Sequence, residues 1–194
     1  KTPEDKLVNK TELLKLCGLE GDANTPVIGI VTRFVDQKGL DLVEAVLPDI
    51  LSDDVRLVVL GTGDWKYEQM FIEAKRRWPD KVSASIMFSG DLANRIYAGA
   101  DMFLMPSKFE PCGLAQMIAL RYGNIPIVRE TGGLKDTVHA LCRHGQRLHL
   151  CKLQRARHAA RYPRGLRRIS LQQAGMEEAH GAGHGERLQL GQLG

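Results

Sequence analysis

The chain has 194 residues, a length that favours a single folded domain. Hydrophobic residues make up 43% of it, enough for one core, and no apolar run approaches the roughly 18 residues that a membrane helix needs. The polar start, Lys1 to Lys6, is not followed by an apolar segment of the kind that signal peptides carry. We therefore expect a cytoplasmic protein that does not bind membranes.

The net charge of +4 is divided unevenly along the chain. Residues 1–140 hold 17 Lys and Arg against 20 Asp and Glu, a balance of −3, whereas residues 141–194 hold 10 against 3, a balance of +7. The second segment contains no Asp, Val or Phe, and it holds five of the six His. A folded α/β domain rarely loses its β-branched residues so abruptly. We therefore expect one domain over residues 1–140 and a disordered tail over residues 141–194.

The four cysteines, at positions 17, 112, 142 and 151, lack the paired spacing of a metal site, so we interpret them as free thiols. Cys112 is a poor candidate nucleophile because no His lies before residue 139 to activate it. We expect its side chain only to pack, and we expect no metal or cofactor.

The first 140 residues alternate between strand and helix patterns. Continuous apolar runs predict strands over residues 27–32, 55–60, 82–88, 100–105 and 125–128. Helical spacing of apolar residues predicts helices over residues 6–16, 39–51, 65–78 and 91–97, and a further helix after Gly113. This alternation is typical of a parallel sheet covered on both faces, with ligands outside the carboxyl ends of its strands. The residues predicted at such ends are Arg33, Gly61, Phe88, Lys108 and Thr131.

The stretch from Pro106 to Gly123 organises the rest of the chain. It reads as the end of a strand, a tight loop that carries Lys108 and Glu110, and a helix. Gly113 would let the backbone approach a ligand closely, and the helix N-terminus presents unpaired N–H groups to an anion. The pattern therefore predicts a phosphate-bearing substrate at this loop.

Three motifs carry a family resemblance. They are Thr-Arg-Phe-Val-Asp-Gln-Lys-Gly-Leu-Asp-Leu at residues 32–42, Ser-Lys-Phe-Glu-Pro-Cys-Gly-Leu at 107–114, and Glu-Thr-Gly-Gly-Leu-Lys-Asp-Thr-Val at 130–138. Over roughly residues 1–140 the chain resembles bacterial glycogen synthase and plant starch synthase. The resemblance implies an α/β fold with a Rossmann-like parallel sheet, the donor-binding C-terminal half of a GT-B glycosyltransferase, here truncated. The N-terminal domain of that family, with its Lys-x-Gly-Gly-Leu loop, is absent, so we expect a fragment that is inactive alone.

The resemblance also implies an activity. Members of the family transfer glucose from ADP-glucose to the nonreducing end of an α-1,4-glucan (glycogen or starch), with retention of configuration and without a metal. The expected partners are therefore ADP-glucose and the glucan, with UDP-glucose an open alternative as donor. The expected compartment is the cytoplasm, or the plastid if the protein comes from a plant.

Three charged residues are the predicted catalytic group. Breaking the bond between sugar and diphosphate builds charge on the diphosphate, and two cations across a strand-to-helix turn, Arg33 and Lys38, could stabilise it. The resemblance assigns both this role, and it implies that Glu110 contacts the donor glucose and stabilises positive charge at the anomeric carbon. The alternatives are that the cations are solvated loop residues and that Glu110 only favours a helix N-terminus.

The predicted substrate-binding residues also follow from the resemblance. Cys112, Gly113 and Leu114 would offer backbone N–H groups to the sugar and phosphate. Thr131 and Gly132 would place small residues next to the phosphate. Phe88 aligns with an aromatic residue that lies against adenine in relatives, although a core position explains a Phe equally well.

Two positions depart from the wider superfamily of retaining nucleotide-sugar transferases. Ile118 stands where many of those enzymes have a second Glu, and glycogen and starch synthases also lack it. Ala115 stands where some relatives have Ser or Thr, so a hydroxyl contact to phosphate is missing.

The segment from residue 141 onward has two interpretations. Its ten cations could bind nucleic acid nonspecifically. However, residues 145–156 and 183–191 can be encoded by codons that, shifted by one nucleotide, read Gly-Asn-Gly-Phe-Thr-Phe-Ala-Asn-Tyr-Asn-Ala and Gly-Met-Ala-Ser-Asp-Tyr-Ser-Trp. Both resemble the ordinary C-terminal sequence of glycogen synthases. We therefore favour a reading frame that slipped near residue 140 over a nucleic-acid-binding tail, and we keep a noncatalytic nucleotide-sugar-binding module as a further alternative.

Overall fold

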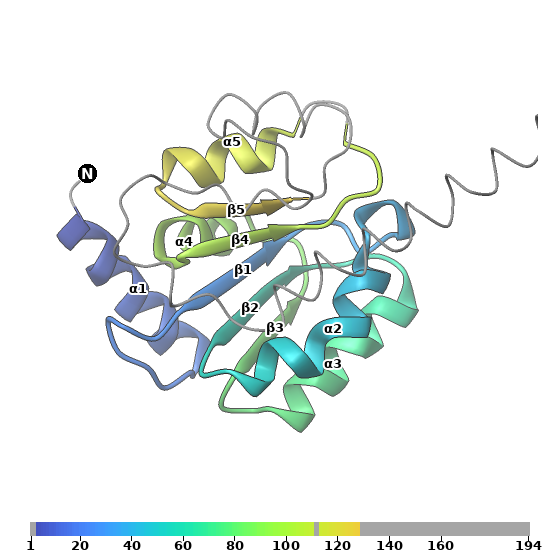
Figure 1. The fold of residues 1–194 in the computed structure, drawn as a ribbon, viewed down its shortest axis with the longest axis horizontal. Helices are drawn as coiled ribbons and strands as arrows, with labels where there is room; N and C mark the ends of the chain where they lie inside the picture. The colour runs from blue at the N-terminus through green and yellow to red at the C-terminus, as the bar shows by residue number, and fades with distance from the viewer. Residues whose placement is uncertain (1–2, 111–112, 129–194) are drawn as a thin grey trace, which may run out of the picture.

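The computed structural model describes residues 3–110 and 113–128, in which helices and strands alternate (Figure 1). The strands are β1 Val27–Val31, β2 Arg56–Gly61, β3 Val82–Ile86, β4 Met102–Met105 and β5 Ile125–Val128. The helices are α1 Pro3–Cys17, α2 Leu40–Ser52, α3 Trp65–Arg77, α4 Gly90–Gly99 and α5 Leu114–Arg121, and a short 3-10 helix, η1, covers Asp36–Lys38. Every strand and helix predicted from the sequence is confirmed.

Some boundaries differ from the prediction. The third strand ends at Ile86 instead of residue 88, because Ser89 caps α4 and its Oγ accepts a hydrogen bond from Leu92 N at 3.2 Å. The fourth strand begins at Met102 instead of residue 100. The side chain of Asp101 turns to Val27 N, which donates to its Oδ2 at 2.8 Å.

All five strands are parallel, in the order β3-β2-β1-β4-β5. From β1 the chain moves one way across the sheet to β2 and β3, and then returns to the other side of β1 for β4 and β5. The order therefore reverses between β1 and β4. In open parallel sheets this reversal opens the crevice where ligands bind, at the carboxyl ends of the strands.

Helices cover both faces of the sheet, as the apolar strands predicted. α2 and α3 pack on one face against alternate strand residues such as Ile30, Leu57 and Leu104. α1, α4 and α5 pack on the other face against the intervening residues, such as Val58 and Phe103. Apart from the half-buried end of β3, the strands are therefore largely buried on both faces, which fixes their register and the positions of the loops beyond their ends.

Helix α5 differs from the expectation in the face that it buries. Leu114, Met117 and Ile118 have the spacing of one apolar helix face, yet these side chains are 66%, 41% and 41% exposed. Ala119 is fully buried instead, in a cluster with Phe103 of β4. A small side chain at this position lets the helix lie close to the sheet, which turns the larger apolar residues outward.

Two lysines attach α1 to the amino ends of β1, β4 and β5. Lys10, only 3% exposed, forms an ion pair with Asp101 Oδ2 at 2.7 Å and donates to the Ala23 carbonyl oxygen at 3.1 Å. Lys6 donates to the carbonyl oxygens of Tyr97 and Tyr122, at 3.3 and 3.1 Å, and to Asn124 Oδ1. This end of the sheet is opposite the one where ligands are expected.

Several predictions fall outside the described residues. These are the roles of Cys112, Thr131 and Gly132 and all statements about residues 141–194. Within the described part of the chain, no helix combines the length and the apolar character that crossing a bilayer requires.

Candidate functional site

The candidate site lies beyond the carboxyl ends of β1 and β4, where the strand order reverses. The segment after β1 carries Arg33 and Lys38, and the segment after β4 carries Ser107, Lys108 and Glu110. Because β1 and β4 are paired, these two segments start side by side although about 70 residues separate them in sequence.

Backbone contacts hold the two segments together. Gly39 has a φ of 68°, and a Cβ at this residue would meet the Pro106 carbonyl oxygen at 2.0 Å, so only glycine permits so close an approach. Lys108 N donates to the Gln37 carbonyl oxygen at 2.9 Å, and Gln37 Nε2 donates to the Phe109 carbonyl oxygen at 3.2 Å. The loop after β4 is therefore fixed against η1.

Lys38 and Glu110 meet across this junction. Lys38 Nζ lies 2.5 Å from Glu110 Oε2, and the two side chains are only 17% and 16% exposed. Ser107, itself buried, donates from Oγ to the same oxygen at 3.3 Å. An ammonium group has three protons, so Lys38 can hold Glu110 with one and still donate to an anion with the others. The structure thus joins two residues that the sequence assigned to one site.

Lys108, the other charged residue that the sequence placed in this loop, also has a charged partner. Its Nζ pairs with Asp41 Oδ2 of α2 at 2.8 Å, and both side chains are 40% exposed. The loop after β4 is therefore tied to α2 as well as to η1. The sequence patterns did not indicate a role for Asp41, and only the fold brings it to this loop.

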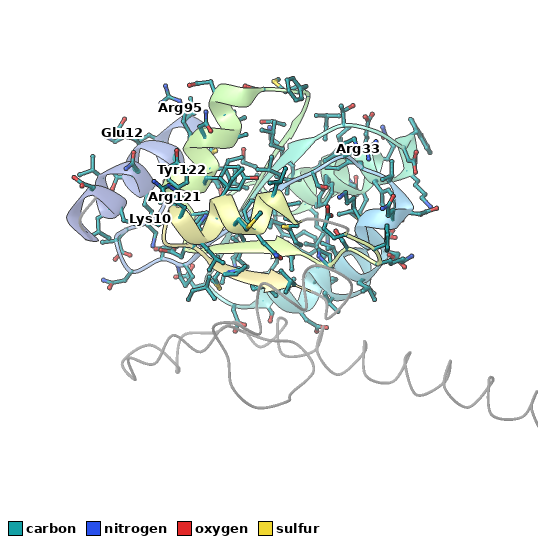
Figure 2. The ribbon with its side chains drawn as sticks, turned by 90° about the horizontal axis from the view of Figure 1, so that it is seen from above. Lys10, Glu12, Arg33, Arg95, Arg121 and Tyr122 are labelled. Atoms are coloured by element: carbon teal, nitrogen blue, oxygen red, sulfur yellow. The ribbon has the colours of Figure 1, made fainter. Side chains whose placement is uncertain are left out.

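Arg33 is the second residue after β1 and is exposed. Figure 2 shows it at the end of the molecule opposite Lys10 and Tyr122. Its backbone neighbours are fixed, because Thr32 N donates to the Leu60 carbonyl oxygen at 3.1 Å and Phe34 N donates to that of Thr62 at 2.9 Å. The guanidinium is therefore a solvent-facing cation on a rigid segment at the carboxyl ends of the strands.

The N-terminus of α5 also lies at these strand ends. Gly113 caps the helix in the left-handed conformation, with a φ of 64°, and it is buried, whereas the Leu114 side chain is exposed. A helix N-terminus directs its first backbone N–H groups outward along the helix axis, here toward the strand ends. Whether these groups bind sugar and phosphate stays a prediction.

Phe88 lies just beyond β3 and is 94% exposed. The core alternative for this residue is therefore wrong, because the strand ends at Ile86 and the chain turns outward before α4. An aromatic face open to solvent at the ligand end of the sheet can stack on a nucleobase.

Hydrogen bonds join Asp36 of η1 to the first turn of α3. Lys66 Nζ and Tyr67 OH both donate to Asp36 Oδ1, at 2.6 and 2.5 Å. These bonds lower the pKa of Asp36 below its usual value, and burial together with the Asp36 carboxylate raises the pKa of Tyr67 to about 12. Asp36 is therefore charged and Tyr67 protonated at neutral pH, so neither is suited to move protons in a reaction. Within the described residues, no three His, Cys, Asp or Glu side chains gather to hold a metal.

Comparison with known proteins agrees with this geometry and defines the class. The family described as Glycosyl transferases group 1 matches residues 25–159, past the boundary predicted at residue 140. The chain belongs to this family, and its five-stranded parallel sheet is that of the C-terminal domain of a GT-B glycosyltransferase.

The particular relatives are glycogen synthases, and this chain is homologous to their C-terminal domain. It is 61% identical to the glycogen synthase of Desulforamulus reducens over 137 aligned residues. The aligned part makes up 71% of this chain and 28% of that protein. It is likewise 61% identical over 134 residues to the glycogen synthase of Clostridium acetobutylicum. That alignment covers 69% of this chain and 28% of the relative. The chain thus spans a little over a quarter of the length of these relatives.

Solved structures extend the comparison. The catalytic domain of starch synthase IV from Arabidopsis thaliana, bound to ADP and acarbose, matches with a TM-score of 0.63 and 39% identity, over 68% of this chain and 27% of that one. The C-terminal domain of the glycosyl transferase group 1 protein LpcC from Francisella tularensis matches with a TM-score of 0.54 and 16% identity, over 71% and 74%. The second likeness shows the fold alone.

Proposed function

We propose that this chain is the donor-binding part of a retaining glucosyltransferase that adds glucose from ADP-glucose to the nonreducing end of an α-1,4-glucan. Support comes from relatives named glycogen synthase and from the starch synthase IV domain that was solved with ADP and acarbose. The cytoplasm, or the plastid in a plant, is the compartment that we propose with it.

The observation that carries the proposal is the ion pair between Lys38 and Glu110. A cation and a carboxylate, both largely withdrawn from water, meet where the strand order reverses. Coulomb interactions are stronger in such a place than on an exposed surface, so these two charges can act on a ligand bound beside them.

The chemistry assigns a role to each charge. As the bond from the anomeric carbon to the diphosphate breaks, negative charge builds on the leaving diphosphate and positive charge on the sugar. Arg33 and Lys38 would stabilise the diphosphate, and Glu110 would stabilise the sugar. Gly113 and Leu114 would add backbone N–H groups, and Phe88 would lie against the adenine.

Calorimetric titration of the full chain with ADP tests the proposal. We expect Lys38→Ala to weaken ADP binding about tenfold to a hundredfold, because a hydrogen bond between charged groups is worth about 1.5–3 kcal/mol. Lys15→Ala is the matched control, since Lys15 also pairs with a Glu but is 70% exposed at the other end of the sheet. Equal affinity in the parent chain and Lys38→Ala would contradict the assignment.

A comparison of ADP with ADP-glucose tests the role of Glu110, because only ADP-glucose carries the sugar. We expect Glu110→Gln to bind ADP at least as tightly as the parent chain, because it removes a negative charge near the phosphates, and to lose affinity for ADP-glucose relative to ADP. An equal change for both ligands would mean that Glu110 does not contact the glucose. Parallel titrations with UDP and UDP-glucose determine which nucleotide is preferred.

A transfer assay separates the enzyme from a noncatalytic binding module. The chain spans about 28% of its relatives, so we expect ADP-glucose binding but no glucan elongation by the chain alone. Elongation by a protein that joins this domain to the remaining part of a relative would support the enzymatic role. A folded joined protein that binds ADP-glucose without elongation would favour the binding module.

A further inference from the structure

The first turn of α3 holds the segment that carries Arg33. Asp36 accepts hydrogen bonds from Lys66 and Tyr67 of this turn, as described above. Deeper in the core, the Phe34 ring contacts the Phe71 ring of α3 with centroids 5.1 Å apart. Two residues that follow Arg33, Phe34 and Asp36, are thus attached to one helix.

The loop between β2 and α3 completes this support. A Cβ at Gly61 would meet the Thr32 carbonyl oxygen at 2.0 Å, and one at Gly63 would meet that of Phe34 at 2.3 Å. The loop backbone also bonds to Phe34, because the Thr62 carbonyl oxygen accepts from Phe34 N at 2.9 Å and Asp64 N donates to the Phe34 carbonyl oxygen at 2.6 Å. On the other side of Arg33, Thr32 N donates to the carbonyl oxygen of Leu60 in β2. A shift of the loop would therefore move the backbone of Arg33.

Glu68 fixes this loop from α3. Its Oε1 accepts from Thr62 Oγ1 at 2.6 Å and from Gly63 N at 3.0 Å. Both bonds lower the pKa of Glu68 below its usual value, so the acceptor is charged at neutral pH. One carboxylate oxygen therefore holds two consecutive residues of the loop that supports Arg33.

We propose that Glu68 is a positioning residue for Arg33 and thereby sets the affinity of the site for a nucleoside diphosphate. This inference rests on the proposed function, because it takes Arg33 to be a diphosphate ligand. Glu68 acts through the Gly61–Asp64 loop and touches no ligand itself. Binding to an anion depends steeply on where the cation lies, so a small displacement of the loop lowers affinity.

The test is a double-mutant cycle measured by calorimetry with ADP and the full chain. We expect Glu68→Ala to weaken ADP binding about tenfold in the parent background and less than twofold in an Arg33→Ala background, because coupled residues are not additive. Glu68→Gln keeps an acceptor oxygen for Thr62 and Gly63, so we expect it to restore affinity to within about twofold of the parent. A general loss of structure would not produce this pattern.

Two further variants keep the test decisive. Glu73→Ala is the matched control, because Glu73 lies on the same helix and pairs with Arg76, yet lies far along α3 from the loop. Thr62→Val removes one of the two donors to Glu68 and should weaken ADP binding in the same direction even if Glu68→Ala fails to fold.

The outcomes distinguish this inference from the proposed function. Equal losses from Glu68→Ala in both backgrounds, or unchanged affinity in Glu68→Ala and Thr62→Val, would overturn the positioning role while parent binding and its sensitivity to Lys38→Ala still support the donor site. Absence of ADP binding in the folded parent chain would overturn both.

Discussion

Lys38 and Glu110 differ from the other ion pairs near the surface in their exposure to water. The Lys15–Glu12 pair of α1 is 70% and 61% exposed, so solvent screens it and it contributes little to stability. Lys38 and Glu110 are each exposed by less than a fifth. Removal of either partner therefore leaves a charge largely without water or a counterion, which makes both residues sensitive positions.

Lys6 gives a prediction of pH dependence. Burial lowers its pKa to about 8, although the Asp101 charge raises it and that of Lys10 lowers it further. Between pH 8 and 10.5 the unfolded chain would keep a proton that the folded chain has lost, so the contribution of Lys6 to stability rises with pH in that window and is constant below it. In urea unfolding followed by circular dichroism, we expect the free energy of the parent minus that of Lys6→Met to rise from pH 8 to 10.

Subtraction of the Lys6→Met data removes the contributions of other groups that titrate in this range. A difference that is constant from pH 7 to 10 would show that the three oxygen atoms around Lys6 keep it charged in the folded chain.

At the scale of elements, η1 is fixed by a close approach of two backbones. Gly39 ends η1 and lies against the Pro106 carbonyl oxygen. Gly18, which follows α1, has an almost equal φ of 66°, but a Cβ added there would meet nothing within 4 Å. A side chain at Gly18 would therefore introduce backbone strain alone, whereas one at Gly39 would add a steric collision with Pro106.

We expect Gly18→Ala to lower the free energy of unfolding by about 1–2 kcal/mol, the cost of a left-handed L-residue. Gly39→Ala should cost clearly more, because its Cβ must push η1 away from the loop that carries Glu110. It should also weaken ADP binding, whereas Gly18→Ala should leave binding unchanged. Urea unfolding and calorimetry measure the two effects, and equal behaviour of the variants would show that the approach at Pro106 is not required.

At the scale of the whole molecule, the two ends of the sheet have different tasks. Figure 2 places Lys10, Arg121 and Tyr122 at one end and Arg33 at the other. The amino ends carry the ion pair of the buried Lys10 with the partly exposed Asp101, which attaches α1, and the carboxyl ends carry the candidate site. Stability and ligand binding should therefore respond to different substitutions.

Lys10→Met tests this division. We expect it to lower the free energy of unfolding by about 3 kcal/mol, because it leaves Asp101 without its buried partner. The dissociation constant for ADP, measured at a temperature where the variant is folded, should change less than twofold, since Lys10 lies far from the site. A large loss of affinity in the folded variant would mean that the two ends are coupled.

Much of this organisation follows from local sequence. Continuous apolar runs such as that of β2 specify strands buried on both faces, and turns such as Gly39 and Gly113 specify where helices begin, because these signals depend on neighbouring residues alone. The motifs around Lys38 and Glu110 also indicated one shared site, and strand alternation placed their segments at one edge of the sheet.

Only the tertiary structure decided which side chains meet. The pairing of Lys108 with Asp41, the support of Arg33 by Glu68 and the exposure of Phe88 all depend on the order β3-β2-β1-β4-β5 and on how the helices pack against it. These contacts join segments from different parts of the chain, or set which way a loop turns. Local patterns fix the period and ends of each element, but the free energy of packing between elements selects their partners.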